Sequence, residues 1–185
     1  MIRPIYLYGS EVLRQKAVPA DIDNDKEGIQ TLVADLWETL KASEGCGLAA
    51  PQVGESVRVA VVDGDVMADV FPYLKGFKRT FINPIVKSFS EAMCEYEEGC
   101  LSVPGIYASV RRPESIVVEY YDESFTLKTE CFDKFACRMI EHEFSHLDGE
   151  LFTDIVAPIR RKMIGKKLQN IAQGKIRTSY KSKIK

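Results

Sequence analysis

Residues 133–149, which read DKFACRMIEHEFSHLDG, decide the interpretation of the whole chain. Asp133 can cap a helix there, and His142 and His146 stand four residues apart on it. Residues at this spacing lie about one helical turn apart on the same face, so both imidazoles can reach one metal ion. Glu143 is adjacent and can lean toward a water molecule on that ion. The chain contains only two histidines and both are in this motif, which favours a metal site over a solvated helical face.

The segments on either side predict a single α+β domain around this helix. Apolar residues recur at helical spacing between about residues 25 and 43, and Gly45-Cys46-Gly47 would end that helix. Four runs are typical of strands: Val57–Asp63, Thr80–Phe89, Ile116–Tyr121 and Phe125–Phe132. Ser10 can cap a short helix, roughly residues 159–173 form a last helix, and Gly64–Arg79 is expected on the surface. We therefore expect antiparallel strands around a central HExxH helix, with N- and C-terminal helices.

The composition excludes several classes of protein. No run of 18 or more apolar residues is present, so we expect no membrane span, and the first residues lack the apolar stretch of a secretory signal. The five cysteines are odd in number and form no CxxC pair, which predicts free thiols in a reducing cytoplasm. We expect neither a membrane nor a DNA partner.

A catalytic metal site needs a third protein ligand besides the two histidines. HExxH proteases usually take a third His or Glu from further downstream; here no third histidine exists, but Glu150 and Asp154 remain as oxygen ligands. The alternative lies upstream, where Cys100 follows a Glu-Gly turn that can bring its thiolate toward a metal. The other four cysteines have apolar or strand-like settings. Spacing alone leaves both alternatives open.

Three segments together resemble the signature motifs of peptide deformylases. Residues 45–52, GCGLAAPQ, match GxGLAAPQ; residues 98–102 match EGCLS; and residues 141–147, EHEFSHL, are similar to QHExxHL. Their order and separation also fit, and the resemblance runs from about residue 3 to residue 160. Two departures affect the last motif: Glu141 stands where the family commonly has Gln, and Ser145 where it commonly has Asp. Neither residue is a ligand, but both can belong to the shell that orients the ligands.

The resemblance implies hydrolysis of the N-formyl group from the initiator methionine of newly made proteins, releasing formate. It assigns one divalent metal ion to Cys100, His142 and His146, with Fe²⁺ in the cell and Zn²⁺, Ni²⁺ or Co²⁺ able to replace it. The ion would lower the pKa of a water molecule, and Glu143 would take its proton and later return it to the amine. The Gln52 amide and the Leu101 backbone N–H would stabilise the charge on the formyl oxygen.

The substrate implied by the resemblance is an N-formylmethionyl nascent peptide. An extended peptide lying against Gly45 and Gly47 would explain why neither carries a side chain. We expect Phe135, Met139 and Tyr96 to form the walls of an apolar slot for the methionine side chain. The complete set of substrate-binding residues that we expect is Gly45, Cys46, Gly47, Leu48, Tyr96, Glu98, Gly99, Phe135 and Met139.

The basic residues are concentrated at the C-terminal end. Residues 160–185 carry ten Lys or Arg and no acid, whereas residues 1–159 carry fifteen bases and all 27 acids, a net charge of −12. We expect residues 1–159 to form the catalytic metallohydrolase domain, and residues 160–185 to be its basic C-terminal helix and tail, loose from about Gly174. An all-basic end on an acidic protein suggests the hypothesis of contact with ribosomes, although charge runs are usually only solvated.

Two other interpretations account for part of the pattern. A zincin-type endopeptidase would use HExxH alone and would be indifferent to Cys100. A ribosome- or RNA-binding module with a structural metal would explain the basic tail. Structural zinc sites usually have four protein ligands, however, and no fourth ligand is evident here.

Overall fold

A five-stranded antiparallel sheet forms the centre of this computed structural model, in which residues 1–184 are described. Its strand order is β2-β3-β4-β7-β8. The strands are β2 (Gly47–Ala49), β3 (Val59–Asp63), β4 (Lys78–Phe89), β7 (Ser115–Tyr121) and β8 (Leu127–Asp133). Along β7 buried and half-buried residues alternate, so Ile116, Val118 and Tyr120 share the core face. The four strands predicted from the sequence are confirmed, and the expected antiparallel arrangement with them.

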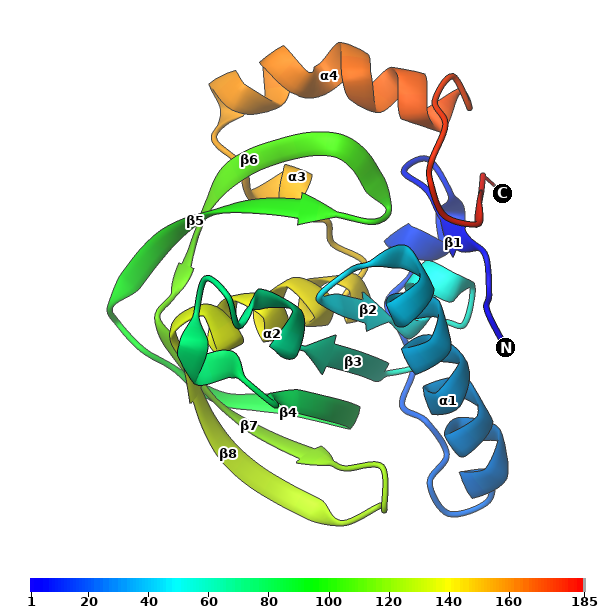
Figure 1. Ribbon diagram of the computed structural model, residues 1–185, viewed down its shortest axis with the longest axis vertical. Helices are drawn as coiled ribbons and strands as arrows, with labels where there is room; N and C mark the ends of the chain where they lie inside the picture. The colour runs from blue at the N-terminus through cyan, green and yellow to red at the C-terminus, as the bar shows by residue number, and fades with distance from the viewer. Residues whose placement is uncertain (185) are drawn as a thin grey trace.

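The HExxH helix α2 (Lys134–Leu147) follows β8 directly and lies across this sheet (Figure 1). Its buried residues Cys137, Ile140, Phe144 and Leu147 recur at helical spacing and pack on the sheet in one apolar cluster. The ring of Phe144 meets Phe81 edge to face, with the ring centroids 5.2 Å apart. The prediction of a central helix over these residues is confirmed.

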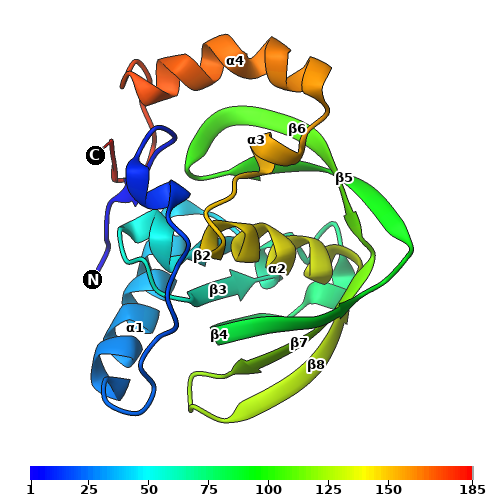
Figure 2. The ribbon, with the colours of Figure 1, turned by 180° about the vertical axis from the view of Figure 1, so that it is seen from behind.

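A second sheet, which the sequence does not predict, pairs β5 (Met93–Cys100) with β6 (Val103–Pro113). The view from behind shows this hairpin between α2 and the last helix (Figure 2). β5 has acids and a glycine where a strand usually has apolar residues, and β6 begins Val-Pro-Gly, so neither gives a strand signal. The expectation that Cys100 follows a turn at Glu98-Gly99 is therefore wrong. Cys100 is the last residue of β5, and the turn comes after it.

The N-terminal part is helical where predicted, with one difference in the length of the first helix. Helix α1 (Lys26–Ser43) begins at Asp25, whose side chain accepts a hydrogen bond from the Gly28 N–H at 3.1 Å. The short helix expected from Ser10 is only a 3-10 turn over Glu11–Arg14.

The segment 64–79, which was expected on the surface, is partly in the core. Its Leu74 is buried, because this segment folds back onto the core.

The C-terminal part contains α3 (Phe152–Ile155), the last helix α4 (Pro158–Ala172) and β9 (Ser182–Lys183). α4 agrees with the prediction within one residue at each end. The loose end predicted from about Gly174 is wrong for residues 175–184, because β9 pairs in parallel with β1 (Ile5–Tyr6). Lys185 lies outside the described residues. Within residues 1–184, none of the helices combines the length and the hydropathy of a membrane-spanning segment.

Candidate active site and metal centre

Three side chains from two elements converge beside the second sheet. Cys100 ends β5, and His142 and His146 project from α2, so that their ligand atoms all lie within 4.8 Å of one another. The Cys100 Sγ is 3.3 Å from the His146 Nε2. Two such ligands on one tetrahedral ion would be separated by about 3.5 Å, given typical metal–sulfur and metal–nitrogen bond lengths. The thiolate and imidazole donors therefore fit a transition-metal ion.

The oxygen ligands considered as an alternative lie elsewhere. Asp154 accepts hydrogen bonds from Arg14 and from the Leu151 N–H, the latter at 2.9 Å, and pairs with Arg161 at 3.2 Å. Its carboxylate therefore caps the N-terminus of α3 and is not a ligand beside the histidines. Glu150 is exposed just beyond the end of α2. Neither belongs to the cluster of ligand atoms.

Glu98 holds one of the histidines in position. Its Oε2 is 2.8 Å from the His142 Nδ1, and its carboxylate accepts hydrogen bonds from Arg112 at 2.7 and 3.0 Å and from Arg138 at 2.6 Å. Burial alone would raise the pKa of Glu98, but the hydrogen bonds from His142 and Arg112 hold it well below its usual range. The carboxylate thus stays charged and leaves the other ring nitrogen of His142 free to face Cys100.

The two histidines respond differently to this environment. Burial opposes a charge on His142, yet its contacts with Cys100 and Glu98 outweigh burial and raise its pKa to about 10. Burial, together with the neighbouring charge on His142, holds the pKa of His146 well below its usual value. The cluster therefore favours positive charge beside Cys100, and a metal ion would also supply positive charge there.

Glu143 is buried next to the ligand cluster with an uncommitted oxygen. Within residues 1–184 its Oε2 has no hydrogen-bond partner, and burial raises its pKa to about 7, although the charge on His142 opposes the shift. Its Oε1 lies where a side chain on Gly47 would be, so any substitution at Gly47 would collide with it. This carboxyl group is poised to exchange a proton near neutral pH.

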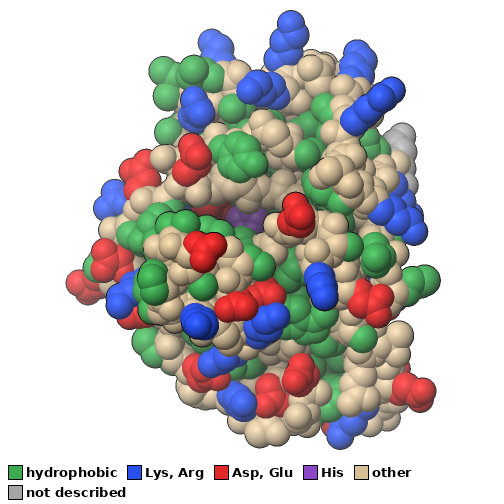
Figure 3. All heavy atoms as spheres, viewed as in Figure 1, with side chains coloured by type: hydrophobic (Ala, Val, Ile, Leu, Met, Phe, Trp, Pro, Cys, Tyr) green, Lys and Arg blue, Asp and Glu red, His purple; other side chains and the backbone are tan. Residues whose placement is uncertain are grey.

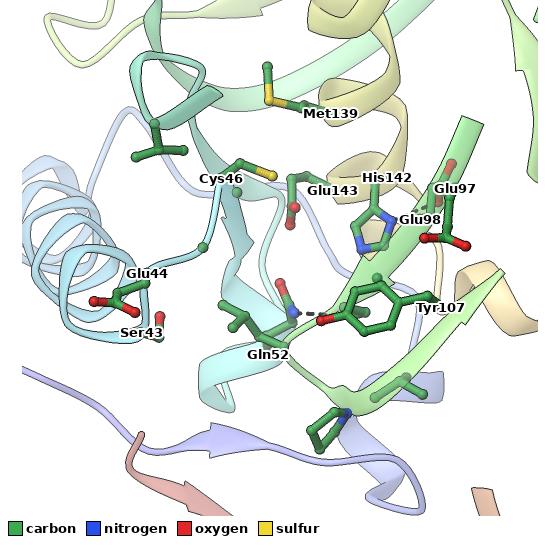
Figure 4. Close-up of a pocket in the computed structure, with 18 of the residues that line it drawn as sticks. Ser43, Glu44, Cys46, Gln52, Glu97, Glu98, Tyr107, Met139, His142 and Glu143 are labelled. Carbon is green, nitrogen blue, oxygen red and sulfur yellow. Dashed lines mark hydrogen bonds and ion pairs between the residues drawn. The ribbon is translucent and has the colours of Figure 1, made fainter. Parts of the chain in front are cut away.

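Gln52 lies on the opposite side of the cavity from Glu143, as Figure 4 shows. Its Oε1 accepts from the Ala49 N–H at 2.8 Å, which fixes the amide so that Nε2 donates to the Ser102 hydroxyl at 3.1 Å. The same Nε2 is 3.7 Å from the Cys100 Sγ. Leu101, whose N–H was the other expected donor, follows Cys100 in the turn and also lines the cavity.

A cavity of about 610 Å³ opens in front of these groups. In the space-filling view a histidine is visible at the base of a hollow in this face (Figure 3). Of the expected substrate-binding residues, those that line it are Gly45, Cys46, Gly47, Glu98, Gly99, Phe135 and Met139. Burial, reinforced by the charge on Glu143, raises the pKa of the Cys46 thiol to about 12, so Cys46 is a neutral wall residue.

Two expected residues do not line the cavity. Leu48 is fully buried, with its side chain in the core between β2 and α1. Tyr96 stands behind the wall, where its ring meets Phe71 and Phe135 edge to face with centroids 6.5 and 5.4 Å away. Phe71 stacks on Phe135 with the ring centroids 4.5 Å apart, so the three rings form one aromatic cluster of which only Phe135 lines the cavity.

Several residues of the site were not predicted. They are Arg112 and Arg138, which bind Glu98, and the cavity residues Val66, Met67, Tyr107 and Tyr180. Arg138 is on α2 four residues before His142, so helical spacing could have pointed to it. The others come from segments outside α2, and no spacing pattern connects them to HExxH. The two departures from the family pattern, Glu141 and Ser145, are buried on α2. The hydroxyl of Ser145 accepts from Arg112 at 3.0 Å, and burial raises the pKa of Glu141.

These observations define an HExxH hydrolase site, and comparisons with known proteins identify its family. The family model for polypeptide deformylases matches residues 2–162. The peptide deformylase of Flavobacterium johnsoniae is 42% identical, over 99% of this chain and 96% of that protein. The crystal structure of peptide deformylase from Thermus thermophilus has a TM-score of 0.83 at 35% identity, over 94% of this chain and 99% of that chain. The crystal structure of a peptide deformylase from Legionella pneumophila has a TM-score of 0.81 at 33% identity, over 96% of this chain and 99% of that chain.

The chain therefore belongs to the polypeptide deformylase family. It is an enzyme of the kind that removes the N-formyl group from nascent peptides. The resemblance inferred from the three motifs is confirmed.

Proposed function

We propose that this chain hydrolyses the N-formyl group of the initiator methionine by a metal-dependent reaction and releases formate. One observation carries the proposal: the uncommitted carboxyl group of Glu143 lines a cavity together with Cys100 and His142, whose ligand atoms cluster with that of His146. Three ligands with an open side are typical of catalytic metal sites, whereas structural sites are usually closed by four. This argues against the RNA-binding module with a structural metal.

Cys100, His142 and His146 would hold one divalent ion. The mixed sulfur and nitrogen donors suit Fe²⁺, which we propose for the cell, and also Zn²⁺, Ni²⁺ or Co²⁺. Such an ion supplies Lewis acidity, which lowers the pKa of water and polarises the formyl oxygen. Glu98 would keep His142 in the tautomer that ligates through Nε2, because its carboxylate accepts from Nδ1 at 2.8 Å.

Glu143 would act as the general base and then as the general acid. Burial raises the pKa of this carboxyl group to about 7 in the metal-free protein. A buried carboxyl group beside the metal ligands could take a proton from the attacking water and return it to the departing amine. As the water attacks, negative charge develops on the formyl oxygen. The Gln52 Nε2–H and the Leu101 N–H would stabilise this charge from the side opposite Glu143.

The methionine side chain would enter the apolar part of the cavity. Phe135, Met139 and Cys46 form its walls, and Met67 closes it from the segment before β4. An unbranched thioether fits such a slot because it is flexible and polarizable. The peptide beyond the methionine would lie along the exposed backbone of Gly45 and Gly47, as in the addition of a strand to a sheet edge.

Residues 1–159 would form the catalytic part and 160–185 a basic extension of the same domain. On α4, Ile164, Leu168 and Ile171 are buried against the body, which leaves a basic face outward. Figure 3 shows Lys and Arg side chains crowding the edge of the molecule over α4. We propose that this face contacts ribosomal RNA phosphates, and that the protein works in the cytoplasm, where its free thiols stay reduced.

The decisive experiment is formate release from a formyl-Met peptide by protein that is purified without oxygen and analysed for metal. We expect turnover to require stoichiometric divalent metal and to leave internal peptide bonds intact. Cleavage of an unformylated peptide at an internal bond would instead support the zincin-type endopeptidase. Absence of formate from metal-loaded protein would refute the proposal.

A further inference from the structure

The C-terminal segment returns to the active site. After α4 the chain turns back past β1 (Figure 1), where the Ile5 N–H donates to the Lys181 carbonyl at 2.9 Å and the Leu7 N–H to the Lys183 carbonyl at 3.0 Å. Between α4 and β9 stands Tyr180, which packs against the apolar cluster of α1 and β3 and also lines the catalytic cavity. Its hydroxyl donates a hydrogen bond of 2.6 Å to the Leu101 carbonyl.

We propose that Tyr180 is a positioning residue for the reaction: by holding the Leu101 carbonyl it limits the φ/ψ rotation of Leu101, and so helps to keep the Leu101 N–H directed toward the substrate oxygen. The inference rests on the proposed function, in which that N–H stabilises the developing charge. Tyr180 itself touches no reacting atom, because its hydroxyl is directed to the carbonyl. The contribution comes from a segment that the sequence suggested to be a loose basic end.

The turn after Cys100 needs support from outside its own hairpin. The register of β5 and β6 shifts between Glu98 and Cys100, and Leu101 and Ser102 lie in the turn that follows the last pair, Cys100 with Val103. Regular ladder hydrogen bonds therefore do not restrain the backbone at Leu101 as they restrain the strands. A backbone donor that must meet an oxygen within a few tenths of an ångström cannot be left on an unrestrained turn.

Three contacts from three different segments supply that support. The Tyr8 N–H donates to the Ser102 carbonyl at 2.7 Å, and the Gln52 side chain donates to the Ser102 hydroxyl at 3.1 Å. Tyr180 provides the third contact, at the residue whose own N–H is the proposed donor. Cys100 restrains the N-terminal side of Leu101, and Tyr180 restrains its C-terminal side. Together they limit the rotation of the Leu101 backbone.

The hydroxyl is suited to a permanent donor role. Burial, together with the charges of Cys100 and Tyr107, raises the pKa of Tyr180, so the proton remains on the oxygen throughout the neutral range. The Thr178 hydroxyl donates to the Tyr180 carbonyl at 2.7 Å and so shapes the segment just before β9. The pairing of β9 with β1 then keeps the ring in place.

Tyr180→Phe tests the proposal because it removes only the hydroxyl. We expect kcat for a short formyl-Met peptide to fall about 3- to 30-fold, less than the roughly 10²–10³-fold cost of removing an oxyanion donor itself. KM should stay within about two-fold, because peptide binding does not use this contact. Stoichiometric metal should be retained, and the visible absorption spectrum of the Co²⁺-loaded variant should match that of the wild type. Tyr121→Phe, which removes a hydroxyl from a ring packed on the same apolar cluster, is the matched control and should leave kcat unchanged.

Each other outcome contradicts the proposal in a distinct way. A Tyr180→Phe variant with wild-type kcat and KM would show that the contact is not needed, while the proposed function would stand. A raised KM with unchanged kcat would make Tyr180 a wall of the peptide site. Lost metal or an altered Co²⁺ spectrum would place its effect on the metal ligands. Metal-loaded wild-type protein that releases no formate would overturn the proposed function and this inference together.

Discussion

The Oε2 of Glu98 and the Nδ1 of His142 lie 2.8 Å apart, and this contact joins the β5–β6 hairpin to the HExxH helix. The same strand carries Cys100 two residues later, so β5 supplies both a proposed ligand and the group that orients a second one. Because Arg112 on β6 and Arg138 on α2 also bind the Glu98 carboxylate, the position of His142 depends on contacts among three elements of the fold. The site is therefore held by tertiary contacts more than by the motif itself.

Replacing Glu98 by Gln should weaken the metal site without removing a ligand. The amide keeps the size of the side chain but loses the charge that sets the tautomer of His142, so we expect metal affinity to fall about 10- to 100-fold. A chelator competition at a temperature where the variant is still folded would measure this. Glu95→Gln, an exposed position on the same strand, is the control. Equal affinity of both variants would show that Glu98 does not orient the ligand.

Cys100→Ala should abolish stoichiometric metal binding and with it the activity, because two imidazoles remain where three ligands are needed. Elemental analysis of the purified protein gives the result directly. Cys131→Ala changes an exposed thiol on β8 and should keep the metal. Retention of metal and rate by Cys100→Ala would mean that another residue closes the site.

Glu143→Gln should separate metal binding from chemistry. The residue is not a ligand, so the metal content should match the wild type, whereas the loss of the general base should lower the rate by about 10²–10⁴. Formate release and elemental analysis on the same preparation test both statements. Activity within a few-fold of wild type would exclude Glu143 as the base.

The metal-free protein should lose stability as the pH rises because of Glu143. Its folded-state pKa of about 7 exceeds the ordinary value of 4.5, so between these values the folded state keeps a proton that the unfolded state has released. The resulting penalty is fully present above pH 7 and corresponds to roughly 3 kcal/mol. Glu143→Gln removes it, so the variant should gain stability relative to wild type from pH 5 to pH 8. Urea unfolding of both metal-free proteins at pH 5 and pH 8 measures this. If the difference in free energy of unfolding between the variant and the wild type is the same at both pH values, Glu143 does not carry the proposed penalty.

The motif and its helix could be predicted because their signal is local. The i, i+4 histidines and the apolar stripe of α2 are properties of one short segment, and the same holds for α1. β5 escaped prediction because acids and a glycine replace the apolar residues of an ordinary strand. Neither Arg112 nor Tyr180 could be assigned a role, since each acts on a group far away in sequence. The tail packs on the body through three apolar residues that alternate with basic ones: Ile176, Tyr180 and Ile184. A prediction based on the charge of the tail alone does not take these residues into account.

The outward face of α4 leads to a last prediction, about ribosomes. Lys162 and Lys166 are exposed there, one turn apart, and each phosphate that they neutralise should make affinity fall with salt. Because residues 175–184 are docked, truncation would disturb the fold and is a poor test. Charge reversal is cleaner: Lys162→Glu with Lys166→Glu should reduce sedimentation with purified ribosomes at low salt and flatten its salt dependence. Activity on a short formyl peptide should not change.

The matched control for that experiment reverses Lys16 and Lys41, which are exposed outside α4. It changes the net charge by the same amount, so it separates a local contact from general attraction between an anionic ribosome and the whole protein. We expect the control pair to sediment like the wild type. If both pairs lose the same amount of binding, α4 has no particular role, because net charge alone would then govern the association. If wild-type protein does not sediment at low salt, the basic face serves another purpose, such as solubility.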